Sequence, residues 1–351
     1  MPHLSPEDLA RTIFPVAAEL SGGGKHPRLE TLAGGASIRR YHRVTLEGGK
    51  LPTVMVMELG DNPLKSEEAA KGAAPAELPF INVQRYLARA GAAVPSVYRY
   101  DAERGFVYLE DLGDITFESR VADAGDDVRA RYYRQAIDQL VALQRFAATN
   151  PDPECVAFSR GFDYDLLKWE LDHFREYGLE AQGFVPTPAQ REELEKIFRR
   201  IAEELAAEPR GFVHRDYQSR NLMVQDVDGT PRLRIIDFQD ALLGTRAYDL
   251  VGLLRDSYVA LSPSLLDALV GHFTDAAAID ASRFQRLFDL QVVQRKLKDA
   301  GRFVFIDRVK HNPSFLVHIP NSLAYVARSL ARLPEFGSLR EILSQYFVQF
   351  E

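Results

Sequence analysis

The sequence predicts an α+β protein with two lobes, a small β-rich N-terminal lobe over residues 1–110 and a larger, mainly helical C-terminal lobe over residues 111–351. Three observations support this prediction. Short β-type runs separated by glycine turns occupy residues 28–59. Apolar residues recur at helical spacing through most of the C-terminal part. Residues 212–224 place a polar loop between two apolar strands.

The N-terminal lobe is expected to begin with a helix over residues 1–21, because Ser5 suits an N-cap and Pro6 suits the first helical position. Residues 60–79, which are rich in Ala, Glu, Lys and Pro, are expected to form an exposed excursion. The other elements predicted for this lobe are strands over Leu29–Leu32, Tyr41–Leu46, Thr53–Leu59, Val94–Tyr100 and Gly105–Leu109, and a helix over Phe80–Ala90.

Helices dominate the predicted C-terminal lobe. The helix over Phe162–Tyr177 is expected to start at the cap Asp163. Its aromatic residues Trp169 and Phe174 are expected to lie in the core, and a platform for a ligand is the alternative. The helix that begins at Ser282 is expected to stop at Gly301, since glycine commonly ends helices. The remaining predicted helices are Arg129–Phe146, one that opens with a capping box at Thr187, one that is capped by Ser262, and Leu339–Phe347.

The composition is that of an ordinary soluble globular protein, with 46% apolar and 26% charged residues. The net charge of −7 argues against nucleic acid as the main partner, because phosphate backbones require a basic face. The single cysteine, Cys155, excludes an intramolecular disulfide and a cysteine-based zinc cluster. Charges are scattered through the N-terminal helix, and no apolar run approaches the ~18 residues of a membrane span. We therefore expect a cytoplasmic protein without membrane contact.

Carboxylate and amide side chains stand at the strand ends around the polar loop. Asn221 follows Asp216 by five residues, and Asp237 ends the next apolar run sixteen residues later. Mg²⁺ prefers a few such oxygens and keeps water and phosphate for the rest of its shell. The order His214-Arg215-Asp216, with Asn221 at this offset, matches a catalytic loop that orients a hydroxyl for phosphoryl transfer. We therefore predict Asp216 as the base, and Asn221 and Asp237 as ligands of Mg²⁺.

The N-terminal lobe is expected to hold the nucleotide. A glycine-containing turn with Ser37 and Arg39 can lie over its phosphates. The third strand has neither lysine nor arginine, although protein kinases place a phosphate-binding lysine there. Arg39 and Arg40 are therefore the candidate phosphate-binding cations. Backbone groups of Glu110 and Leu112 are expected to pair with the adenine edge. The chain has no P-loop sequence.

Residues 214–249 resemble the aminoglycoside phosphotransferase family, the small-molecule relatives of protein kinases. The resemblance rests on the catalytic-loop residues, on Ile236-Asp237-Phe238-Gln239-Asp240-Ala241-Leu242-Leu243-Gly244, and on Tyr248-Asp249-Leu250. Gln239 stands where protein kinases carry glycine, which favours the small-molecule branch. The resemblance implies a protein-kinase-like fold, ATP and Mg²⁺ as cofactors, and Asp249 as a structural support of the catalytic loop.

Three stretches resemble a narrower group of this family, the bacterial anomeric kinases of N-acetylmuramate and N-acetylglucosamine in peptidoglycan recycling: residues 35–41, 166–174 and 212–256. This resemblance implies a kinase that converts these amino sugars to sugar-1-phosphates. It places Glu170 with the sugar, and we also expect Asp240 and Arg255 to contact the substrate. We expect Arg220 to stabilise charge on the transferred phosphoryl group. Arg255 or Arg302 could pair with the lactyl carboxylate of N-acetylmuramate.

Two other interpretations stay open. An aminoglycoside or other small-molecule phosphotransferase fits the acidic balance of the chain, although the cations of the catalytic loop would repel a polycationic drug. A non-catalytic nucleotide-binding regulatory module fits the absence of the third-strand lysine. The presence of Asp216, Asn221 and Asp237 argues against the module. We expect a monomer with a small-molecule amino sugar as its substrate.

Overall fold

The computed structural model describes residues 4–32, 39–60, 77–227 and 230–350. Contacts divide the chain into two compact units. The first unit comprises Met1–Ile115 and Met223–Gln239, and the second comprises Thr116–Leu222 and Asp240–Glu351. Most of the excursion predicted at residues 60–79 lies outside the described residues, and so does Ser37.

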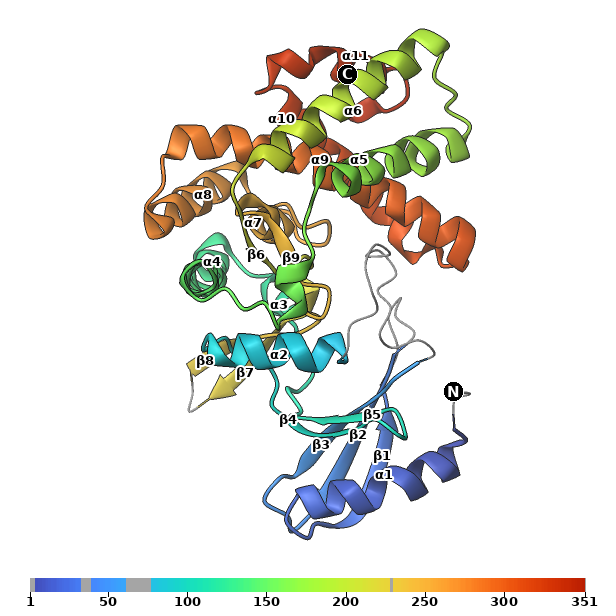
Figure 1. Ribbon diagram of the computed structural model, residues 1–351, viewed down its shortest axis with the longest axis vertical. Coiled ribbons are helices and arrows are strands. Elements are labelled where there is room, and N and C mark those ends of the chain that lie inside the picture. The colour runs from blue at the N-terminus through green and yellow to red at the C-terminus, as the bar shows by residue number, and fades with distance from the viewer. Residues whose placement is uncertain (1–3, 33–38, 61–76, 228–229, 351) are drawn as a thin grey trace. The chain divides into compact units, whose positions relative to one another are not determined.

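A five-stranded antiparallel sheet with the strand order β1-β2-β3-β5-β4 forms the centre of the first unit (Figure 1). A hairpin of β7 and β8 belongs mostly to the same unit. The elements are α1 (Pro6–Leu20), β1 (Lys25–Thr31), β2 (Arg40–Glu47), β3 (Thr53–Glu58), α2 (Pro79–Arg89), β4 (Val97–Asp101), β5 (Phe106–Leu109), β7 (Leu222–Val227) and β8 (Thr230–Ile235). The strands lie within a few residues of their predicted positions.

An apolar stripe explains why α1 lies on this sheet. Ser5 accepts a hydrogen bond from the Asp8 N–H and caps the helix, as predicted. Leu9, Ile13 and Ala17 follow at four-residue intervals, so they share one face of α1. That face forms an apolar core with residues of β2, β3 and β5, namely Val44, Leu46, Val54, Val56, Phe106 and Tyr108.

The second unit is mainly helical. Its elements are α3 (Phe117–Val121), α4 (Asp126–Thr149), α5 (Tyr164–His173), α6 (Pro188–Ala207), β6 (Arg210–Val213), β9 (Leu242–Thr245), α7 (Ala247–Leu254), α8 (Pro263–Ala277), α9 (Ala281–Lys310), α10 (Ile319–Leu330) and α11 (Gly337–Ser344). The predicted caps Asp163, Thr187 and Ser262 are confirmed, because each side chain accepts a hydrogen bond from a backbone N–H of its helix.

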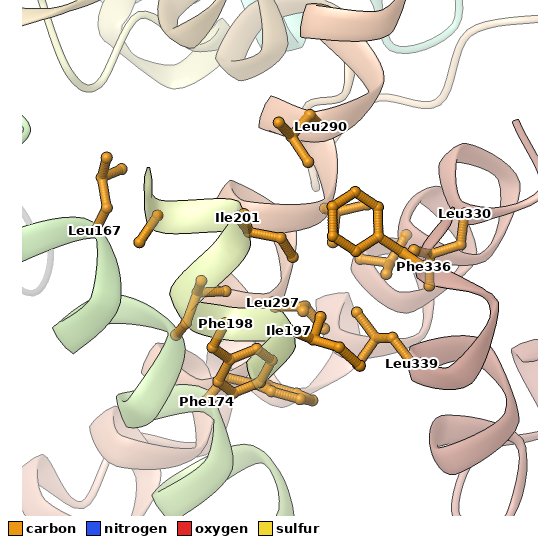
Figure 2. Packing of buried hydrophobic residues seen from close by; sticks show 14 of the residues in the cluster. Leu167, Phe174, Ile197, Phe198, Ile201, Leu290, Leu297, Leu330, Phe336 and Leu339 are labelled. Carbon is orange, nitrogen blue, oxygen red and sulfur yellow. The ribbon is translucent and has the colours of Figure 1, made fainter. Parts of the chain in front are cut away.

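The core of the second unit is an apolar cluster to which α5, α6, α9, α10 and α11 contribute (Figure 2). Leu297 of α9 and Ile201 of α6 are completely buried in it. Burying one such side chain stabilises a fold by about 2 kcal/mol. The cluster therefore holds α9 firmly, and α9 carries several of the charges that surround the catalytic loop.

The prediction that α9 stops at Gly301 is wrong, because the helix continues to Lys310. A Cβ at Gly301 would lie 2.7 Å from the Cα of Phe174, so the two backbones can approach this closely only at a glycine. The helix is followed instead by His311, which has a left-handed backbone with φ of 55°. Gly301 marks a helix contact and not a helix end.

The prediction that Trp169 lies in the core is also wrong. Phe174 is fully buried as expected, whereas 46% of the surface of Trp169 is exposed. Trp169 stands two residues from both Leu167 and Leu171, which face the core. Two residues correspond to a rotation of about 200° around a helix, so Trp169 points away from that core. Beyond His173, α5 passes into a π-helical turn over Phe174–Leu179.

Candidate active site

The loop between β6 and β7 carries the predicted base, Asp216. Arg215, one residue earlier, has a left-handed backbone with φ of 81°, which costs of order 1 kcal/mol in a residue with a side chain. Asp249 of α7 holds this turn, because its carboxylate accepts the backbone N–H of His214 at 2.7 Å and that of Arg215 at 3.0 Å. Burial raises the pKa of Asp249 to about 7, although the two N–H groups lower it. The predicted supporting role of Asp249 is confirmed.

Asn221 lies across the loop from Asp216. Its Nδ2 donates to the backbone carbonyl oxygen of Asp216 at 2.9 Å. The backbone N–H of Asp216 lies 3.3 Å from His214 Nδ1. The Asp216 side chain is 34% exposed, so a small molecule can reach its carboxylate. Because Asn221 uses its Nδ2 within the loop, its Oδ1 is the atom suited to a cation. The structure thus brings Asp216 and Asn221 together.

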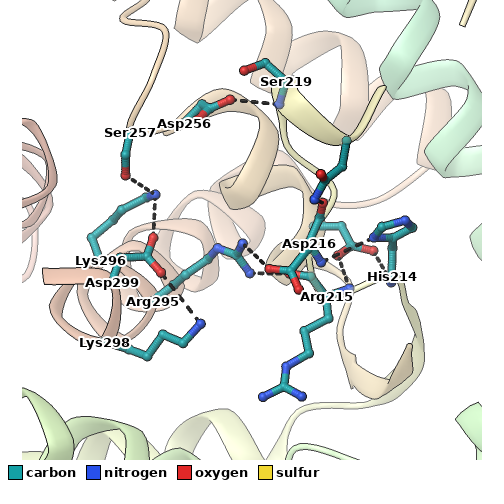
Figure 3. A network of polar contacts seen from close by, with 12 residues as sticks. His214, Arg215, Asp216, Ser219, Asp256, Ser257, Arg295, Lys296, Lys298 and Asp299 are labelled. Atoms are coloured by element: carbon teal, nitrogen blue, oxygen red, sulfur yellow. Dashed lines mark hydrogen bonds and ion pairs between the residues drawn. The ribbon is translucent and has the colours of Figure 1, made fainter. Parts of the chain in front are cut away.

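A buried arginine of α9 also reaches the loop (Figure 3). Arg295 is 1% exposed, and its Nη1 donates to the carbonyl oxygen of Arg215 at 2.7 Å. Its Nη2 lies 3.8 Å from Asp216 Oδ1, and its guanidinium lies over the ring of Tyr248 at 4.4 Å from the centroid. Arg295 therefore holds both the loop backbone and the Asp216 carboxylate. Sequence analysis missed this residue, because 80 positions separate it from Arg215.

Asp256 anchors the second half of the loop. Its carboxylate accepts the backbone N–H of Ser219 at 2.8 Å and that of Tyr258 at 3.0 Å. Burial raises the pKa of Asp256, and the hydrogen bonds from Ser219 oppose this rise. Two buried carboxylates, from α7 and from the segment after it, thus fix the two ends of the catalytic loop.

Three further charges of α9 lie close to this network (Figure 3). Lys296 Nζ donates to Ser257 Oγ at 3.2 Å and to Asp299 Oδ2 at 2.8 Å. Lys298 Nζ lies 3.7 Å from Asp299 Oδ1. Sequence analysis did not single these residues out. The available signal was a dense run of charges, from Arg295 to Asp299, inside a helix with many apolar residues.

Arg220, the residue expected beside the transferred phosphoryl group, makes contacts within the second unit. Its Nε donates to Glu118 of α3 at 2.7 Å, and its guanidinium lies over the ring of Tyr258 at 3.5 Å from the centroid. The Arg220 side chain is 40% exposed, so it can still meet a ligand. Its role toward phosphate stays a prediction.

The three residues predicted to meet the sugar lie in different surroundings. Glu170 is fully buried, accepts a hydrogen bond from Gln294 at 2.7 Å and lies 3.8 Å from Arg215. Arg255 is 3% exposed and lies over the Tyr325 ring, and burial lowers its pKa to about 10. Direct contact of either residue with a sugar would require this packing to open. Asp240 is half-buried and acts electrostatically on Arg160. All three roles stay predictions.

Asp237, the second expected metal ligand, belongs to the first unit. It has a left-handed backbone with φ of 63°, and its Oδ1 accepts a hydrogen bond from Gln239 Nε2 at 2.8 Å. Burial raises the pKa of the Tyr41 hydroxyl to about 12, while Arg39 lowers it and Asp237 raises it. Arg39 and Asp237 therefore lie near the same hydroxyl. Arg40 is exposed at the start of β2.

The segment expected to contact adenine is held by an arginine of β8. The backbone N–H of Glu110 donates to the Ser96 carbonyl oxygen at 2.9 Å, which leaves the Glu110 carbonyl as its group for a ligand. Its side chain pairs with Arg234 at 2.7 Å. Burial raises the pKa of Glu110, but the hydrogen bonds from Arg234 and Ser96 lower it overall. Leu112 is buried, and its contact with adenine stays a prediction.

Among the described residues, no group of three or more His, Cys, Asp and Glu side chains gathers in a way that could hold a metal ion by itself. Mg²⁺ that arrives with a nucleotide needs only one or two protein ligands, and the amide of Asn221 and the carboxylate of Asp237 each have the oxygen donor that it prefers. In the part of the chain that the structure describes, no helix is both long enough and apolar enough to cross a bilayer.

Comparison with solved structures supports the predicted fold. A GDP complex of an aminoglycoside 2'-phosphotransferase matches with a TM-score of 0.60 at 16% identity, covering 93% of this chain and 98% of that one. A choline kinase from Cryptosporidium parvum matches with a TM-score of 0.59 at 10% identity, covering 93% and 94%. The predicted bilobal, protein-kinase-like α+β fold is confirmed.

Curated relatives cover much of the chain. A protein of Pseudomonas putida named N-acetylmuramate/N-acetylglucosamine kinase is 32% identical over 76% of this chain and 77% of its own length. Proteins with the same name from Pseudomonas aeruginosa and Caulobacter vibrioides are each 31% identical, over 92% and 94% of this chain and 90% and 95% of their own lengths. The model of the Phosphotransferase enzyme family matches residues 28–284. This chain therefore belongs to the phosphotransferase enzyme family, as its catalytic-loop sequence predicts.

Proposed function

We propose that this chain is an ATP-dependent kinase of the amino sugars N-acetylmuramate and N-acetylglucosamine. The observation that carries the proposal is the name shared by four relatives, each about 30% identical to this chain over 76% to 94% of its length. The held conformation of the Asp216 loop supports a catalytic protein over a non-catalytic regulatory module. A module without turnover has no need for an accessible carboxylate with this much support.

In the proposed reaction, Asp216 accepts the proton of the acceptor hydroxyl as that oxygen attacks the terminal phosphate. The contacts of Asp249 and Arg295 hold the loop, so the Asp216 carboxylate is oriented before the substrate arrives. Positioning of this kind suits phosphoryl transfer, in which the protein does little covalent chemistry. Asn221 and Asp237 would hold Mg²⁺, which when bound neutralises charge on the phosphates.

The other proposed contacts divide between nucleotide and acceptor. Arg39 and Arg40 would meet the phosphates in place of a third-strand lysine. The backbone of Glu110 and Leu112 would pair with the adenine. Arg220 would stabilise the transferred group.

We assign the transfer to the anomeric hydroxyl, with a sugar-1-phosphate as the product. The anomeric hydroxyl belongs to a hemiacetal and is therefore more acidic than an ordinary alcohol. A weaker base can accept the proton of such a hydroxyl, so a carboxylate such as Asp216 suffices. The proposed physiological setting is peptidoglycan recycling, in which both amino sugars are released from the cell wall.

The deciding experiment follows phosphate transfer by phosphorus NMR. The chain is incubated with ATP and Mg²⁺ and with N-acetylmuramate, N-acetylglucosamine or gentamicin as the acceptor. A sugar-1-phosphate should form with the amino sugars and no product with gentamicin. Asp216→Asn should lower kcat by about 10²- to 10⁴-fold and keep nucleotide binding. A folded wild-type chain that binds ATP but phosphorylates neither amino sugar would contradict the proposal.

A further inference from the structure

An exposed aromatic group stands on the second unit, next to the helix that supports the catalytic loop. Trp169 is the only tryptophan of the chain, and 46% of its surface is exposed. Its ring stacks on that of His173, with 5.3 Å between centroids and an angle of 24°. His173 also packs against Tyr177 and Phe305. We call these four residues the aromatic shelf.

The residues on which Trp169 stacks are themselves well packed. His173 is only 8% exposed, and Tyr177 meets Phe305 edge-on at 5.1 Å. The π-helical turn that follows α5 places Tyr177 on this face, and π-helical turns occur frequently at functional sites. Arg302 of α9 lies over the Phe305 ring at 4.8 Å. The Trp169 ring therefore lies on a packed support, and nearly half of the residue's surface stays exposed.

Contacts along α5 and α9 connect the shelf to the catalytic loop. The two helices run side by side, since Glu170 of α5 bonds to Gln294 of α9, and the backbone at Phe174 touches Gly301. On α9, Arg295 and Arg302 are seven residues apart and share one face, with a rise of about 10 Å between them.

Residues on this face of α9 contact both the catalytic loop and the aromatic shelf. At one end Arg295 reaches Asp216, and at the other Arg302 covers Phe305 of the shelf. Trp169 itself immediately precedes Glu170, whose carboxylate lies 3.8 Å from Arg215 of the catalytic loop. Residues of the α5–α9 pair therefore contact both the aromatic shelf and the catalytic loop.

We propose that the aromatic shelf binds the pyranose ring of the acceptor sugar, which stacks on Trp169. A pyranose presents C–H bonds on its face and hydroxyl groups at its edge. The large, electron-rich face of an indole suits the C–H face, and the hydroxyl groups stay free for polar partners. Arg302 of α9, which lies over the Phe305 ring of the shelf, is one such partner. This inference rests on the proposed function, because it names the site that receives that acceptor.

The kinetic test replaces Trp169, whose exposed ring can be removed without opening the core. Trp169→Ala should raise KM for N-acetylglucosamine and for N-acetylmuramate by about tenfold each, since both sugars contain the same pyranose ring. KM for ATP and kcat should change by less than about threefold. Trp169→Phe should recover most of the loss. Tyr100→Ala, which removes an exposed ring from β4 of the other unit, is the matched control and should leave every constant unchanged.

A second readout uses the fluorescence of the single tryptophan. Titration of the full chain with N-acetylglucosamine, without nucleotide, should shift the emission of Trp169 in a saturable way. Glycerol at equal concentration should not. An amino sugar kinase whose sugar KM is the same with Trp169 and with alanine would overturn the shelf alone. A wild-type chain without amino sugar kinase activity and without a fluorescence response would overturn both the shelf and the proposed function.

Discussion

The pKa of the Asp299 carboxyl group depends strongly on the charged residues around it. Its side chain is 14% exposed and lies 2.8 Å from Lys296 Nζ and 3.7 Å from Lys298 Nζ. Burial by itself raises the pKa of Asp299, but the cations Lys296, Lys298 and Arg295 lower it to about 2. The same cations surround the catalytic loop, so Asp299 balances charge that would otherwise be buried without compensation.

The lowered pKa predicts how stability depends on pH. A carboxyl group with a lower pKa in the folded chain stabilises the fold above its ordinary pKa of 3.8, and loses this contribution as the pH falls toward 2. The difference corresponds to about 2 kcal/mol. Asp299→Asn should therefore lower the free energy of unfolding by about 2 kcal/mol at pH 7, and by clearly less at pH 3. Urea denaturation at both pH values measures this.

The control for this prediction is Asp226→Asn, which changes an exposed aspartate of β7. It should have little effect on the free energy of unfolding at either pH. If wild type and Asp299→Asn differ in free energy of unfolding by the same amount at pH 7 and pH 3, the charge of Asp299 contributes nothing to stability.

At the scale of elements, the contact between α9 and the π-helical turn depends on one glycine. A Cβ at Gly301 would lie 2.7 Å from the Phe174 Cα and 3.1 Å from the His173 carbonyl oxygen. Both neighbours are backbone atoms, which cannot turn aside as a flexible side chain can. This contact sets the spacing of the two helices that carry the aromatic shelf.

Gly301→Ala should lower the free energy of unfolding by about 1–3 kcal/mol, because α9 must move away from the turn. Gly271→Ala is the matched control in the middle of α8, where a Cβ would meet nothing within 4 Å. It should stabilise the chain by about 0.5–1 kcal/mol, as alanine does in place of glycine in an open helix position. Thermal unfolding of both variants measures the two changes in stability. If both changes had the same sign, this account of Gly301 would be refuted.

At the scale of the whole molecule, each of the two units has its own apolar core. Of the residues proposed to bind Mg²⁺, Asn221 belongs to the second unit and Asp237 to the first. A ligand that binds only the folded chain stabilises it in proportion to the logarithm of its concentration.

We expect a non-hydrolysable ATP analogue with Mg²⁺, at about 100 times its Kd, to stabilise the chain by about 2.7 kcal/mol. Differential scanning fluorimetry should show a higher Tm that falls back when EDTA removes the metal. Asn221→Ala and Asp237→Ala should each lose the part of the shift that depends on Mg²⁺. An equal Tm shift with and without Mg²⁺ in the wild-type chain would argue against metal binding by these residues.

Local patterns in the sequence by themselves determined most elements of this protein and the chemistry of its catalytic loop. The caps at Ser5 and Thr187, and the spacing of Asp216 and Asn221, could be predicted because each depends on residues only a few positions apart. Only the tertiary structure decided which charges meet Asp216, since Arg295 arrives from a helix far along the chain.

The two wrong predictions have the same origin. Gly301 continues a helix, and Trp169 faces outward, because the packing of α5 against α9 assigns each helix face its neighbour. Glycine and tryptophan carry a local preference, for a helix end and for the core, that is weaker than the constraint of close packing. Sequence periodicity shows that a helix has faces, and the long-range contacts of the folded chain decide what each face meets.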